Sequence, residues 1–77
     1  MEIKVIVDKH RKNGDTMEFM VSDFYGGKYI ISNCHRIESP FWKSHHVRCF
    51  IGNIDNGQLI KRGVFRIYNC NYGIVVI

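Results

Sequence analysis

The β-branched residues isoleucine and valine dominate this chain, and the two best helix formers are almost absent. Eleven isoleucines and seven valines stand against a single leucine, Leu59, and no alanine. Isoleucine and valine favour strands because two heavy atoms on the Cβ restrict χ1, whereas alanine and leucine favour helices. The composition therefore predicts an all-β protein.

The chain has 77 residues, which is the size of one small domain. A chain this short needs nearly every apolar side chain for a single hydrophobic core. We therefore expect residues 1–77 to form one β domain, either a small barrel or a strongly bent antiparallel sheet of five to seven strands. Ser39 followed by Pro40 resembles a helix start, so at most one short helical turn is expected, near residues 39–44.

The first expected hairpin surrounds an Asn-Gly turn. A three-residue loop at Lys12–Gly14, ending in the glycine, would pair Val7 with Phe19 and put the apolar residues of both strands on one face. At the other end of the sequence, the tail Ile74–Ile77 has no polar face. We expect it to be an interior strand or the strand that closes a barrel.

A second Asn-Gly turn, at residues 55–57, predicts another hairpin. The same register would pair Val47 with Phe65. The residues directed to the core would then be Val47, Cys49, Ile51, Phe65 and Ile67. The opposite face of this hairpin would lie outside the core and is the main candidate for a functional surface.

This predicted outer face is basic and aromatic. It carries His46, Arg48, Phe50, Arg62, Arg66 and Tyr68 with no acidic residue, and the neighbouring segment adds Trp42 and Lys43. Lys9–Lys12 adds a basic loop tip, and the net charge is +4. Guanidinium groups bind phosphates and aromatic rings stack on bases. The leading hypothesis is therefore a small non-enzymatic binding module for nucleic acid.

The same residues allow other interpretations. Arginine and the aromatic residues are enriched at protein interfaces, so the protein could bind an acidic protein partner. It would then act as an inhibitor or adaptor, as small phage or mobile-element accessory proteins often do. A free strand edge could form a homodimer. The basic face could also be an ordinary solvated surface.

The sequence shows no constellation that carries catalysis. Zinc sites use cysteines two to four residues apart, and Cys34, Cys49 and Cys70 include no such pair. No glycine loop for phosphates and no paired carboxylates are present. We therefore expect no enzyme, no metal and no cofactor. Because no signal peptide is visible and the longest apolar run, Ile74–Ile77, is too short for a membrane span, we expect a cytoplasmic protein without a membrane segment.

Overall fold

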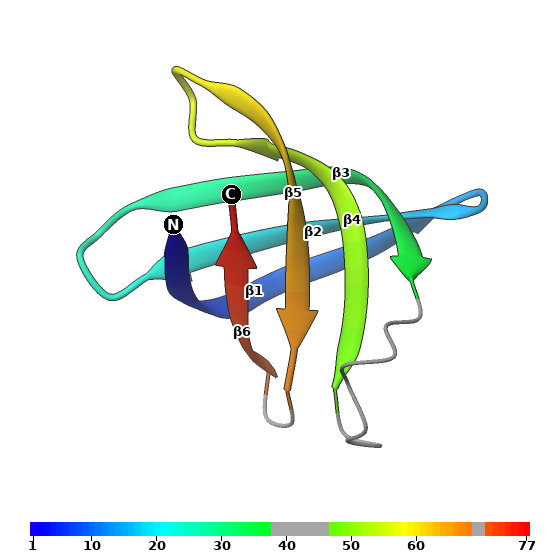
Figure 1. The fold of residues 1–77 in the computed structure, drawn as a ribbon, viewed down its shortest axis with the longest axis horizontal. Helices are drawn as coiled ribbons and strands as arrows, with labels where there is room; N and C mark the ends of the chain where they lie inside the picture. Colours follow the sequence, from blue (N-terminus) through cyan, green and yellow to red (C-terminus); the bar gives the residue numbers. More distant parts are fainter. Residues whose placement is uncertain (38–46, 69–70) are drawn as a thin grey trace.

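The computed structural model describes residues 1–37, 47–68 and 71–77, and these form a closed antiparallel barrel whose six strands follow sequence order (Figure 1). The strands are β1 (Glu2–Asn13), β2 (Thr16–Asp23), β3 (Lys28–Ile37), β4 (Arg48–Asp55), β5 (Ile60–Ile67) and β6 (Tyr72–Val76). The predicted all-β barrel is thus confirmed. The helical turn expected near 39–44 lies outside the described residues.

The barrel consists of two groups of strands that cross each other. β1, β2 and β3 run side by side, and β4, β5 and β6 cross them at a steep angle (Figure 1). β6 pairs with β5 on one side and with β1 on the other, where Glu2 lies opposite Val76. The apolar tail therefore closes the barrel, as its sequence predicted. None of the described residues belongs to a helix long and apolar enough to cross a membrane.

One continuous core fills the barrel. Its side chains come from all six strands and follow the alternation of a strand, except where the bulge in β3 interrupts it. The most deeply buried members are Val5, Val21, Ile31, Cys34, Ile54, Phe65 and Val75. Two aromatic contacts join the crossing groups of strands, since the ring of Phe19 packs against those of Phe50 and Phe65.

A β-bulge in β3 lets this strand turn from β2 toward β4. The pairing of β3 with β4 shifts between Ser32 and His35, and Asn33 has a left-handed backbone with φ of 52°. The bulge presses against Gly52, where a Cβ would lie 2.6 Å from the carbonyl oxygen of Ser32. It also shifts the side-chain alternation, so that Cys34 and Arg36 take inward positions beyond it.

The register predicted for the first hairpin is wrong, although its apolar residues do share the inner face. The turn is Gly14-Asp15, with Gly14 at φ of 63° and Asn13 opposite Thr16. A bulge at Asp8 then places Val7 opposite Val21 instead of Phe19. The prediction assumed a regular ladder, whereas the structure combines a shorter loop with a bulge that keeps both apolar rows inside.

The register predicted for the second hairpin is also wrong, and here the error changes which face is inside. Phe50, not Val47, lies opposite Phe65, and the last pair before the loop is Asp55 with Ile60. The longer loop is held by side-chain acceptors, because the carboxylate of Asp55 accepts a hydrogen bond from the Gly57 amide (2.6 Å). The shift of three residues is odd, so β4 turns its other face to the core.

Candidate functional site

The reversal of β4 divides the predicted basic face. Phe50 is only 7% exposed and belongs to the core. Arg48 lies opposite Ile67 on the inner side of the barrel wall, whereas Arg62 and Arg66 remain on the outer side. The expectation that these residues form one surface is therefore wrong. His46, Trp42 and Lys43 lie outside the described residues.

The outer members of the predicted face are engaged in different ways. Arg66 is mostly buried, and its guanidinium lies 3.9 Å from the carboxylate of Glu2. The ring of Tyr68 packs against Tyr72 with centroids 5.8 Å apart. Arg62 is exposed on β5, opposite Asn53. The outer side of this hairpin therefore does not combine exposed guanidinium groups with exposed aromatic rings.

Instead, one end of the barrel gathers basic side chains at inward-facing register positions. Four of them are exposed there: His10, Lys12, Arg36 and Arg48. Each lies directly opposite an inward apolar residue, namely Phe19, Met17, Phe50 and Ile67 in that order. We call these four residues the basic mouth. They come from β1, β3 and β4, so the mouth depends on closure of the barrel.

A cavity of about 130 Å³ opens at this end of the barrel, and two residues of the basic mouth, His10 and Arg48, line it. Its apolar floor and walls include the rings of Phe19 and Phe50, whose centroids are 5.0 Å apart and whose planes are tilted by 58°. Among the described residues, Val7, Met17 and Ile67 are the other apolar lining residues, and His10, Arg48 and Asn71 are the polar ones. Such a site favours a flat apolar group attached to something anionic.

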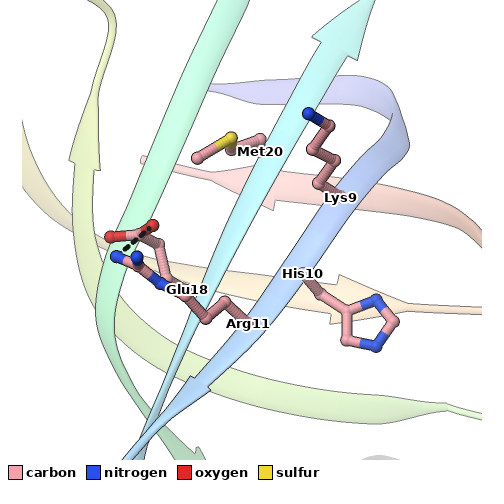
Figure 2. Close-up of a pocket in the computed structure, with 5 residues that line it drawn as sticks. All are labelled: Lys9, His10, Arg11, Glu18 and Met20. Atoms are coloured by element: carbon pink, nitrogen blue, oxygen red, sulfur yellow. Dashed lines mark hydrogen bonds and ion pairs between the residues drawn. The ribbon is translucent and has the colours of Figure 1, made fainter.

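The carboxylate of Glu18, near this end of the molecule, is not at an inward position. Glu18 sits on the outer side of the hairpin, where its Oε1 is 3.0 Å from the guanidinium of Arg11. Figure 2 shows His10 pointing away from this ion pair. Within residues 1–37, 47–68 and 71–77, the inward positions at the mouth carry no acidic side chain. Each basic residue of the mouth therefore faces an apolar residue, and not a carboxylate, across its strand pair.

The two described cysteines are protonated thiols at neutral pH. Burial, with a further contribution from Glu18, raises the pKa of Cys34 to about 11. Burial also raises the pKa of Cys49, although Arg66 partly opposes the change. The reactive and metal-binding form of cysteine is the thiolate, which these surroundings disfavour. In the described part of the chain, no three His, Cys, Asp or Glu side chains are grouped to hold a metal ion.

Comparison with known proteins gives no relative. No family model, curated protein or solved structure matches this chain at a significant level. The functional proposal therefore rests on the geometry of the site.

The sequence contained part of the signal for the mouth. The run Lys9–Lys12 is clearly basic in the sequence, but the bulge at Asp8 puts His10 and Lys12 at inward positions and Lys9 and Arg11 at outward positions. Arg36 and Asn71 carried no sequence signal, because only the closed barrel brings the ends of β3 and β5 to the same opening.

Proposed function

We propose that the protein binds nucleic acid, and that it does so through the basic mouth rather than through the outer face of a hairpin. The observation that carries the proposal is a cavity lined by His10, Arg48 and two phenylalanine rings. Two more exposed basic residues, Lys12 and Arg36, occupy inward register positions at the same end of the barrel. Lysine and arginine displace counterions from the phosphate backbone, which gives affinity without sequence preference. Aromatic rings give an additional contact to bases.

The mouth fits a nucleic-acid strand better than an isolated anion. His10 and Lys12 project from β1, and Arg36 and Arg48 from β3 and β4, so cations stand on different sides of the opening. A strand that crosses the opening would bring several successive phosphates near them. Long basic side chains adapt to a flexible backbone without forming a fixed anion site.

The salt dependence of binding tests this proposal. We expect fluorescence anisotropy to show binding of labelled oligonucleotides that weakens steeply between about 50 and 200 mM salt. Arg48→Ala and Lys12→Ala should each weaken binding and lower the salt slope by about one unit. Both side chains are exposed, so the melting temperature should change little.

Arg62→Ala is the matched control, because it removes the same charge from the outer side of β5. It should leave affinity and salt slope nearly unchanged. An intact protein that binds neither single-stranded nor duplex nucleic acid at about 50 mM salt would refute the proposal and leave the acidic-protein partner as the hypothesis. Equal losses from Arg62→Ala and Arg48→Ala would show that the mouth is not the binding site.

A further inference from the structure

We infer that the cavity of the basic mouth takes one unpaired pyrimidine base, an inference that rests on the proposed binding of nucleic acid. The first reason is size. An apolar protein cavity of roughly 150 Å³ holds one benzene ring. The mouth cavity, at about 130 Å³, therefore has room for a single six-membered ring. The larger fused rings of a purine would extend further out of this open cavity.

The second reason is the chemistry of the lining. Phe19 and Phe50 are buried in the core, at 3% and 7% exposed, and the accessible parts of their rings give an inserted base an apolar contact at the bottom of the cavity. Asn71 supplies a side-chain amide to the lining, and an amide both donates and accepts hydrogen bonds. The Watson–Crick edge of a pyrimidine likewise offers donors and acceptors together. The lining thus pairs an apolar base face with a polar base edge.

The third reason is the position of the basic side chains. Arg48 and His10 line the same cavity, and they come from β4 and β1 on different sides of the opening. A nucleotide carries its phosphates outside the base. With the base inserted, its flanking phosphates would therefore remain at the level of these side chains.

The cavity cannot take a base that is paired within a duplex. A paired base is stacked on both faces and hydrogen-bonded at its Watson–Crick edge, and extruding it costs a few kcal/mol. Single-stranded nucleic acid presents its bases without that cost. We therefore expect single strands to bind more tightly than duplexes of the same sequence.

The test compares three short single-stranded oligonucleotides of equal length: oligothymidylate, oligoadenylate and a phosphodiester of the same length with abasic sites. Oligothymidylate should bind roughly 5- to 150-fold more tightly than the abasic strand, which is the usual range for stacking one base. Oligoadenylate should resemble the abasic strand. The salt slope should be similar for all three, because they carry the same phosphates.

The outcomes separate this inference from the proposed function. Equal binding of all three strands would overturn the base site and leave phosphate binding intact. Adenylate binding as tight as thymidylate binding would overturn the preference for pyrimidines. If no strand binds, both proposals fail.

Asn71→Gly isolates the part played by the amide. Asn71 has φ of 60°, a left-handed conformation that glycine adopts freely, so this change removes the side chain without straining the backbone. It should reduce the preference for thymidylate while leaving the salt slope unchanged. Asn33→Gly is the control, because Asn33 is the other left-handed asparagine and does not line the cavity. Equal effects of the two changes would overturn the role of Asn71.

Discussion

Truncating Phe50 tests the direction in which β4 faces, on which the whole mouth depends. The side chain is 7% exposed, and its ring lies 5.0 Å from that of Phe19. Replacing a core phenylalanine with alanine costs roughly 3–5 kcal/mol. A chain of this length is stable by only about 4–12 kcal/mol, so Phe50→Ala removes a large share of the total. On an exposed face, the same truncation would cost within about 0.5 kcal/mol.

Urea denaturation followed by circular dichroism measures the effect, and Phe50→Leu provides a milder change of the same sign if the alanine variant is largely unfolded. In thermal melts each kcal/mol lost should lower the melting temperature by about 4–8 °C. Ile51→Ala is the control, since Ile51 is the next residue along β4 and lies half-buried on the outer side. If Phe50→Ala costs less than Ile51→Ala, β4 faces the other way and Arg48 does not belong to the mouth.

Three further predictions concern the scaffold. Gly52→Ala should destabilise the barrel by roughly 1–3 kcal/mol in urea, because its Cβ would meet the Ser32 carbonyl at 2.6 Å; no loss would contradict the close approach of the bulge. Hydrogen bonds from the Tyr25 and Gly27 amides hold the pKa of Asp23 below 3.8, so their stabilisation is present above that pH and is lost as the pH falls through the lowered pKa. Asp23→Asn should therefore reduce stability at neutral pH and flatten the acid branch of a stability-versus-pH curve; an unchanged acid branch would contradict this. Because the pKa of Cys34 is about 11, its alkylation at mildly alkaline pH should be much slower in the folded than in the urea-unfolded protein, as mass spectrometry of the labelled peptide would show; equal rates would contradict its burial.

The strand content and the closure of the barrel could be predicted from local features. The excess of isoleucine and valine indicated strands, and the apolar tail at Ile74–Ile77 indicated a strand with neighbours on both sides. Glycines marked two turns, and both Gly14 and Gly57 do have positive φ. These features depend on residues close together in the chain, so a single sequence reveals them.

The registers could not be predicted in the same way. A turn can have two, three or four residues with the same Asn-Gly pair inside it, and the hydrogen bond from the Gly57 amide to Asp55 selects the longer loop. The bulges at Asp8 and Asn33 depend on contacts between strands that are distant in sequence. A prediction that uses only the alternation of apolar and polar residues, without the bulges and the loop length, turns the wrong face of β4 toward the core.

The error in the register of β4 also decided which site residues were predicted correctly. Arg48 was identified as a binding residue from its charge, and it remains one in the proposal, but Phe50 lines the cavity from the core instead of standing on an outer surface. Arg36 and Asn71 were missed, because neither has a sequence neighbour that suggests a site. A concave site assembled from several strands is a property of the closed barrel, and the sequence of any single strand does not contain it.

Closure of the barrel also sets the order in which it can fold. The backbone of Met1 exchanges hydrogen bonds with that of Ile77, 76 positions away, and the β1–β6 ladder follows from this end. Contacts of such high sequence separation form slowly, because a long loop must be closed before they contribute. We therefore expect the successive hairpins to form before the β1–β6 pairing. During synthesis, one edge of β1 therefore stays unpaired until β6 has been synthesised and has folded. In that time the nascent chain can pair with another chain.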